Sequence, residues 1–153
     1  MYTRQEASQL KQAFWTTFGQ YMAPVLSAEG EKINWVNYKT GEKGISFRLE
    51  ADNKEASAFI ELNDPDPGMQ QLYFEQFEQL SHLFNAEMGP RWTWNLHMNN
   101  EYGKIVSRIG CNMLGISVLN KEDWPQLISF FKEKITALDA FWSQVKYSFE
   151  ALR

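Results

Sequence analysis

The sequence predicts a single α+β domain over residues 1–153, in which an antiparallel sheet of about five strands packs on helices. Two observations lead to this prediction. Apolar residues recur at three- and four-residue steps from Trp124 to the C-terminus, which is typical of an amphipathic helix. In two earlier regions, residues 33–62 and 92–109, apolar and polar residues alternate, which is typical of half-buried strands. The expected order is α-β-β-β-α-β-β-α, with an extra short strand as an option.

The first helix is predicted to begin at Thr3, because Glu6 follows three residues later and completes a capping box. Its apolar stripe ends at Pro24. The last helix has a longer apolar seam, made of Trp124, Ile128, Phe131, Ile135, Leu138, Trp142, Val145, Phe149 and Leu152. We expect the two helices to pair through a long apolar contact. Heptad-like spacing serves a contact within one chain and a contact across a dimer equally well, so both remain open.

Three strands are predicted between these helices, at residues 33–38, 45–51 and 56–62, as an antiparallel meander. Asp66 and Pro67 then mark the start of a helix that runs to Met88 and ends at Gly89. A second hairpin follows, with Trp92, Trp94, Leu96 and Met98 as its inner row, a turn at residues 99–103 and a return strand at 104–109. Residues 113–119 are the optional short strand.

The composition is that of a globular protein, with 44% hydrophobic and 22% charged residues. A net charge of −4 gives no general attraction for nucleic acid or for an anionic membrane. The single cysteine, Cys111, cannot form an internal disulfide, and the sequence has no secretory signal or apolar run of membrane-spanning length. We therefore expect a cytoplasmic protein with no membrane association, no metal and no cofactor.

The alternation places a set of polar residues on the second face of the sheet. Arg48, Arg91, Asn95, His97, Lys104 and Arg108 are the candidate binding residues, and Glu50, Phe59, Glu61 and Val106 lie among them. A solvated face with cross-strand ion pairs explains this pattern. A binding surface explains it as well, with the arginines and the lysine contacting phosphate or carboxylate and an exposed ring available for stacking.

One enzymatic hypothesis arises from the order of elements. A helix, three antiparallel strands, a helix and a further strand is the order of the restriction-endonuclease-like core, where acidic residues and a lysine bind a divalent metal. The matching carboxylates here are Glu50, Asp52 and Glu61, but the lysine is missing. The sequence therefore favours a protein without enzymatic activity, and a degenerate or divergent nuclease-like domain that acts on nucleic acid is the alternative.

Several segments are similar to a known bacterial family. These are "FW…F…YM" in the first helix, "AEMG…WTW" at the end of the second, "GISVLNKEDWP", and "FW" at Trp142. They resemble the family catalogued as domain of unknown function 4268. The resemblance implies an α+β domain without assigned activity that follows a nuclease-like domain in longer proteins, and it supplies no catalytic residues.

Together these features predict a non-enzymatic binding or accessory module. The resemblance implies a link to bacterial DNA-processing systems. A protein partner or self-association as a homo-oligomer is the favoured interaction, and nucleic acid is the alternative partner.

Overall fold

A four-stranded antiparallel sheet with helices on one side forms the core of the fold. The structure is a computed structural model that describes residues 2–152. Its helices are α1 (Arg4–Met22), α2 (Pro67–Gln79), α3 (Ser81–Met88) and α4 (Trp124–Glu150), with a short 3-10 turn η1 (Lys121–Asp123) before α4. The strands β1 (Ile45–Ala51), β2 (Glu55–Leu62), β3 (Thr93–Asn99) and β4 (Ile105–Leu114) pair in the order β1-β2-β4-β3. The predicted fold class is confirmed, with four strands in place of about five.

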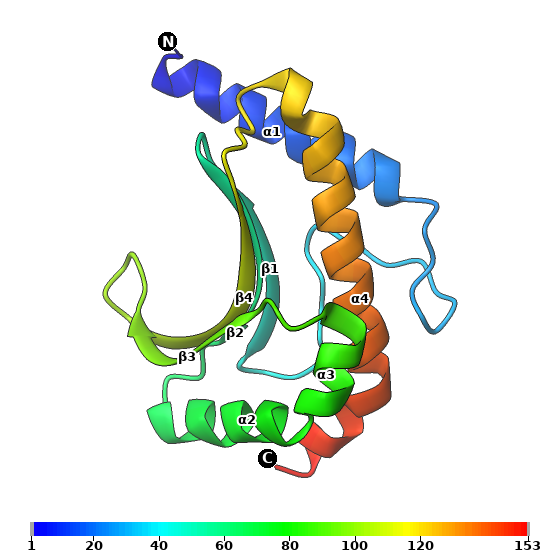
Figure 1. Ribbon diagram of the computed structural model, residues 1–153, viewed down its shortest axis with the longest axis vertical. Helices are drawn as coiled ribbons and strands as arrows, with labels where there is room; N and C mark the ends of the chain where they lie inside the picture. The colour runs from blue at the N-terminus through cyan, green and yellow to red at the C-terminus, as the bar shows by residue number, and fades with distance from the viewer. Residues whose placement is uncertain (1, 153) are drawn as a thin grey trace.

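The sheet is curved, and the helices are not distributed evenly around it (Figure 1). Helices α1, α3 and α4 lie on the convex side of the sheet, and α2 runs along one end. The concave side carries no helix of the described chain, and the β3–β4 hairpin curls toward it. One sheet face is therefore part of the core and the other remains accessible.

The apolar seam of α4 is covered within the chain. Phe131, Ile135 and Leu138 in its middle are fully buried. Four elements supply the covering side chains. Phe14 and Phe18 of α1 contact Phe131, and Phe47 of β1 contacts Trp142. Phe77 of α2 contacts Phe149, and Phe84 of α3 contacts Phe141. The seam is therefore covered by other elements of the same chain and needs no second subunit to bury it.

The predicted long contact between the first and last helices is wrong in its extent. Helices α1 and α4 cross each other (Figure 1), so the rings of α1 reach only the first turns of α4, at Trp124 and Phe131. The sheet, α2 and α3 cover the rest of α4, because a helix of 27 residues is longer than the contact that two crossing helices can make. Although α4 is long, none of the helices in residues 2–152 is apolar enough to cross a membrane.

The predicted helix starts are confirmed by their caps. The Thr3 hydroxyl accepts a hydrogen bond from the backbone N–H of Glu6, and the Glu6 carboxylate accepts one from the Thr3 N–H. The Asp66 carboxylate accepts a hydrogen bond from the N–H of Gly68, and Pro67 is the first helical residue. Each cap satisfies backbone donors that the first helical turn leaves unpaired.

The single helix predicted from Pro67 to Met88 is wrong, because the chain changes direction at Leu80 and forms α2 and α3. The turn brings Phe84 edge-on to Trp92 at 5.3 Å and to Phe141 of α4 at the same centroid distance. A straight helix would carry Phe84 away from α4. Tertiary packing of this ring therefore overrides the local helical periodicity.

The strand predicted at residues 33–38 is also wrong. The Asn34 side chain accepts hydrogen bonds from the N–H groups of Val36 and Asn37, which forms a turn that competes with an extended strand. The Tyr38 hydroxyl donates to the buried carboxylate of Asp139 at 2.6 Å, and the Ala28 N–H donates to the other oxygen at 2.7 Å. Long-range polar contacts with α4 thus hold this segment as a loop.

The optional strand at residues 113–119 is not a separate element. Strand β4 continues to Leu114, and Gly115 then turns the chain with a φ of 71°. The following residues donate backbone hydrogen bonds to the β1–β2 turn, from Gly115 to Lys54 and from Val118 to Asp52. The segment therefore caps the end of the β1–β2 hairpin without extending the sheet.

Replacing Phe131 by Ala should remove the ring that joins α1 to α4. We expect the free energy of unfolding to fall by about 3–5 kcal/mol, because the cavity left among Phe14, Trp15 and Phe18 cannot collapse fully. Urea denaturation followed by circular dichroism measures the loss. Ser129→Ala, at an exposed position two residues earlier, is the matched control. Equal stability of the two variants would contradict a structural role for this crossing.

Candidate functional site

The accessible face of the sheet is built from two rows of cross-strand neighbours. One row consists of Ser46, Glu61, Arg108 and Asn95, and the next consists of Arg48, Phe59, Gly110 and Thr93. Because side chains alternate between faces along a strand, every member of these rows points away from α4. We call this surface the concave face. The prediction that Arg48, Glu61, Asn95 and Arg108 share one face is confirmed.

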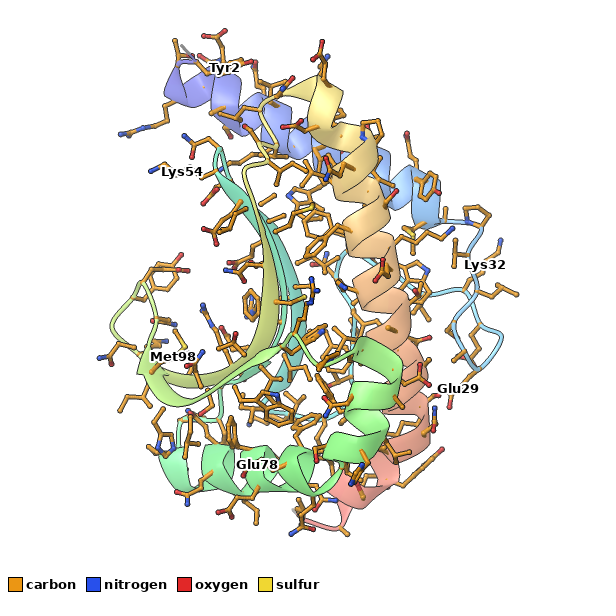
Figure 2. The ribbon with its side chains drawn as sticks, in the orientation of Figure 1. Tyr2, Glu29, Lys32, Lys54, Glu78 and Met98 are labelled. Atoms are coloured by element: carbon orange, nitrogen blue, oxygen red, sulfur yellow. The ribbon has the colours of Figure 1, made fainter. Side chains whose placement is uncertain are left out.

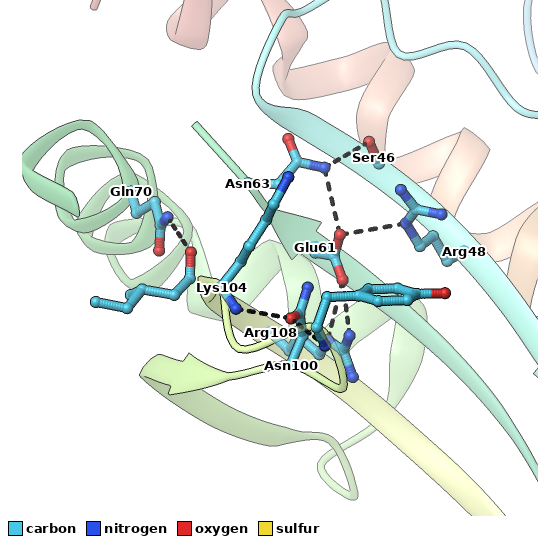
Figure 3. A network of polar contacts seen from close by, with 10 residues as sticks. Ser46, Arg48, Glu61, Asn63, Gln70, Asn100, Lys104 and Arg108 are labelled. Atoms are coloured by element: carbon cyan, nitrogen blue, oxygen red, sulfur yellow. Dashed lines mark hydrogen bonds and ion pairs between the residues drawn. The ribbon is translucent and has the colours of Figure 1, made fainter. Parts of the chain in front are cut away.

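Glu61 lies at the centre of the concave face and holds two arginines (Figure 3). It is 5% exposed, and its Oε2 atom accepts hydrogen bonds from Arg108 Nε at 3.1 Å and Nη2 at 2.9 Å. Its Oε1 atom forms an ion pair with Arg48 Nε at 3.3 Å. Asn63 Nδ2 donates to the same oxygen and to Ser46 Oγ. One buried carboxylate therefore fixes two guanidinium groups from different strands.

Gly110 and Phe59 determine where Arg108 can lie. A methyl group at Gly110 would stand 2.6 Å from Phe59 Cβ, so only glycine allows β2 and β4 to carry these partners opposite each other. The Phe59 ring is 4% exposed, and Arg108 Cζ lies 4.6 Å above its centroid. Stacking on the ring and pairing with Glu61 fix the Arg108 side chain from two directions.

The β3–β4 hairpin forms one wall of the site. Asn100 stabilises its turn, since the Oδ1 atom accepts hydrogen bonds from the N–H groups of Tyr102 and Lys104. The buried Gln70 of α2 donates to the carbonyl of Ile105 and accepts from the Ser107 hydroxyl. Helix α2 therefore anchors the hairpin, while Tyr102 at its tip is 79% exposed.

Two adjoining pockets lie along the concave face. The first, which we call the hairpin pocket, has a volume of about 620 Å³ and is lined by Arg48, Glu50, Glu61, Asn63, Glu101, Tyr102, Lys104 and Arg108 among others. The second, the strand pocket, has a volume of about 560 Å³ and is lined by Glu55, Ser57, Arg91, Asn95 and Asn112 among others. Both hollows include Glu50 and Arg108, so they form one continuous groove.

The groove is electrostatically balanced. Its positive groups are Arg48, Arg91, Lys104 and Arg108, and its negative groups are Glu50, Glu55, Glu61 and Glu101. Burial raises the pKa of Glu50 above its ordinary value of 4.5, and the carboxylates of Glu101 and Glu61 act in the same direction, whereas Arg108 and Arg48 oppose them. The groove is therefore lined by acidic and basic groups in equal number.

His97 does not belong to the concave face, contrary to the prediction. A β-bulge lies between the pairs Asn95–Arg108 and Met98–Val106, and it gives β3 one extra residue. His97 takes a left-handed φ of 53°, and its Nε2 atom lies 2.8 Å from the Pro67 carbonyl of α2. The bulge also moves Met98 from the predicted inner row to the concave side (Figure 2).

The other predicted binding residues line the groove at its ends. Lys104 lies in the hairpin pocket, and Arg91 lies in the strand pocket at the chain entry to β3. Phe59 and Val106 are on the predicted face but are buried, so the Phe59 ring and the Val106 methyl groups offer a ligand little surface. The exposed ring of the hairpin pocket is Tyr102, which the sequence-based reasoning did not select.

The three carboxylates of the nuclease hypothesis do not converge. Asp52 lies in the β1–β2 turn, where it accepts hydrogen bonds from the N–H groups of Lys54 and Glu55. It is separated from the row of Glu61 by about 20 Å of extended strand. The two oxygens of Glu61 are engaged by arginines, and no group of three metal-ligating side chains occurs within residues 2–152.

Cys111 lies on the core side of β4, opposite Ala58. Burial raises the pKa of its thiol to about 11, so the thiolate that a nucleophile requires is scarce at neutral pH.

Sequence-based reasoning did not select Ser46, Asn63, Asn100, Tyr102 and Gly110 as binding residues. A glycine inside a strand pattern is a signal of close backbone approach, and Gly110 could have been selected on that ground. Asn63 directly follows the strand that carries Glu61, and Asn100 and Tyr102 lie in the predicted turn. Their convergence depends on the curl of the hairpin, for which the local sequence has no signal.

The fold and the groove define an α+β domain with a polar, uncovered sheet face. The family model described as "Domain of unknown function (DUF4268)" matches residues 10–146 of the 153-residue chain. The protein therefore belongs to this family, as its sequence motifs indicated. The comparisons with curated proteins and with solved structures found no match.

Gly110→Ala should disturb the concave face and lower stability together. We expect the free energy of unfolding to fall by about 1–3 kcal/mol, because the new methyl group overlaps Phe59 Cβ and forces the strands or the ring to shift. Gly19→Ala is the matched control, since a methyl group there meets Val36 at an ordinary 3.6 Å within helix α1. Thermal unfolding monitored by circular dichroism compares the two variants. A Gly110→Ala protein as stable as wild type would show that the close approach is dispensable.

Glu50→Gln should change how stability depends on pH. A raised pKa means that the folded state prefers the protonated Glu50, so wild-type stability falls as pH rises from 4.5 through the folded-state pKa. The glutamine variant lacks this loss and should gain stability relative to wild type at about pH 7 but not at about pH 4. Urea denaturation at both pH values measures the difference. Glu78→Gln, exposed on α2 outside the groove, reports the effect of removing an ordinary surface carboxylate. A stability gain that is the same at both pH values would contradict the raised pKa.

Proposed function

We propose that this protein is a non-enzymatic binding module whose concave face binds a segment of a partner protein. The observation that carries the proposal is a polar sheet face that no other part of the described chain covers. Its charged side chains are held in place before any ligand arrives, because Glu61 fixes both Arg48 and Arg108. Side chains fixed in this way lose little conformational entropy on binding, which favours recognition.

The charge pattern favours a polypeptide over a nucleic acid as the ligand. A nucleic-acid strand presents a regular series of negative phosphates and is bound by surfaces with an excess of lysine and arginine. The groove has as many acidic as basic groups, and the whole chain has a net charge of −4. A phosphate chain along the groove would meet Glu50 and Glu55, whereas a peptide can place side chains of either sign opposite them.

The absence of enzymatic activity is part of the proposal. Glu61 is engaged by two arginines, Asp52 is engaged in a turn, and the pKa of Cys111 is raised. These groups are occupied in ways that oppose metal binding, nucleophilic attack and general base chemistry. The chemical state of these groups therefore supports a protein without enzymatic activity. We expect that adding Mg²⁺ or Mn²⁺ to the protein will produce no cleavage of DNA or RNA.

Self-association is a separate part of the proposal. The covered seam of α4 removes the reason to expect a dimer through that helix. The sheet has two outer edges, β1 and β3, because β1 pairs only with β2 and β3 only with β4. We propose the outer edge of β3, in the hairpin that borders the groove, as the place where a second chain could add. We propose a cytoplasmic location because the single cysteine is partly buried and unpaired. The link to bacterial DNA-processing systems rests on the family resemblance and stays a prediction.

Site-specific photocrosslinking tests the binding face. Tyr102 is replaced by p-benzoylphenylalanine in cells that make the protein, and irradiated extracts are analysed by immunoblot and mass spectrometry. We expect one discrete protein adduct, since Tyr102 stands exposed at the rim of the hairpin pocket. The same replacement at Tyr147, which is 63% exposed on α4 outside the groove, is the matched control.

An adduct of equal yield at both positions would contradict the proposal, as would no adduct at Tyr102. Loss of the Tyr102 adduct after nuclease treatment would identify nucleic acid as the ligand in place of protein. A salt-sensitive gel shift with single-stranded DNA and RNA then measures that interaction directly.

A further inference from the structure

The two arginines of the hairpin pocket have donors that the fold does not use. Arg48 contacts Glu61 only through Nε, and its side chain is 49% exposed. Arg108 uses Nε and Nη2, which leaves Nη1. Within residues 2–152, no other hydrogen-bond partner is found for the Nη atoms of Arg48 or for Nη1 of Arg108. Both guanidinium groups line the same hollow, so these donors are available to one ligand group.

The net charge of Arg48, Arg108 and Glu61 together is complementary to a ligand group with a single negative charge. Two arginines and one buried glutamate leave one net positive charge at the floor of the hairpin pocket. A carboxylate neutralises that charge and accepts several hydrogen bonds from planar guanidinium groups. A phosphate dianion would exceed the charge of this cluster. Lys104 would attract the remaining negative charge, but Glu50 and Glu101, which line the same pocket, would repel it.

The same two glutamates, Glu50 and Glu101, favour a positive charge near the bound carboxylate. An extended peptide advances about 3.3 Å per residue, so a hollow of this size covers only a few residues of ligand. A lysine or arginine within about two to four residues of the acidic residue can reach Glu50 or Glu101. The hairpin pocket therefore has the charge pattern of a receptor for a mixed-charge segment.

We infer that Arg48 and Arg108 together bind the side-chain carboxylate of one aspartate or glutamate in an extended partner segment, and that a basic residue nearby in the segment pairs with Glu50 or Glu101. This inference deepens the proposed function and rests on it. Glu61 is a positioning residue, because it orients both guanidinium groups and also limits the net charge that they present.

Peptide selection tests the inference without knowledge of the natural partner. A displayed library of random dodecapeptides is selected on the full chain, and the best peptide is synthesised for fluorescence anisotropy. We expect the selected sequences to share one acidic residue with a basic residue two to four positions away. Changing that acidic residue to its amide should weaken binding about tenfold, the effect of losing a charge-assisted hydrogen-bonded pair.

Variants of the protein locate the peptide on the concave face. Arg48→Ala should weaken binding about tenfold, and Arg48→Lys should restore only part of the affinity because an ammonium group lacks the planar fork. Lys32→Ala removes an exposed cation on the opposite side of the molecule from Met98 (Figure 2) and should bind like wild type. Thermal unfolding of each variant verifies that the fold is retained; Arg48 is exposed, so its replacement leaves the core unchanged.

Glu61→Gln provides a readout that a purely structural role would not affect. Removing the buried negative charge raises the net charge of the cluster from one to two, so binding should shift in favour of a phosphoserine version of the same peptide. The measured quantity is the ratio of the two affinities in wild type and variant. An unchanged ratio would overturn the assignment to Glu61.

The inference fails if no peptide is selected, if the selected peptides lack an acidic residue, or if Arg48→Ala binds as well as Lys32→Ala. It also fails if a single-stranded oligonucleotide binds and depends on Arg48, since the ligand would then be nucleic acid. The binding function itself is tested separately: a Tyr102 protein adduct that forms with the same yield in the Arg48→Ala variant as in wild type would support the binding face while rejecting the carboxylate receptor.

Discussion

The requirement to bury the apolar seam of α4 determines how the rest of the chain is arranged. This helix of 27 residues has buried side chains from Leu127 to Phe149, and no single element of the fold is long enough to cover them. Helix α1 covers the first turns, the sheet covers the middle, and α2 and α3 cover the end. The sheet contributes only one face to this core. Its second face is therefore free, and the polar side chains on it are a consequence of the same packing that makes the fold stable.

The fold was predictable from sequence where local patterns and tertiary packing agree. Strands β1 and β2 follow the alternation of residues 45–51 and 56–62, and α1 begins at the capping box of Thr3. Prediction failed at residues 33–38 and at Leu80, where contacts distant in sequence decide the structure. The Asp139 carboxylate, 101 residues from Tyr38, holds the first of these segments as a loop. The packing of Phe84 against α4 and β3 makes the chain change direction at Leu80. Neither partner is visible in a local window of sequence.

The candidate site was predictable to the extent that strand periodicity is regular. Arg48, Glu61 and Arg108 fall on one face because each strand there alternates without interruption. His97 was misplaced because a bulge adds one residue to β3, and one residue exchanges the two faces. Phe59 was correctly placed on the face but is covered by Arg108, a contact that depends on the missing side chain at Gly110. The set of atoms that converge in the hairpin pocket therefore depends on the bulge, on Gly110 and on the curl of the β3–β4 hairpin. The two-residue alternation of a strand encodes none of these three features.

The burial of Glu61 is the reason that we propose recognition, and not catalysis, for this surface. A buried carboxylate held by two arginines is a poor base and a poor metal ligand, because either role requires it to leave partners that offset the unfavourable burial of its charge. The same arrangement holds Arg48 and Arg108 on strands that flank β2, with some of their guanidinium donors not used by the fold. Binding to such groups requires little rearrangement of the protein. In the proposed recognition, the strands therefore supply the anchoring charges, and Tyr102 at the hairpin tip adds an exposed ring beside them.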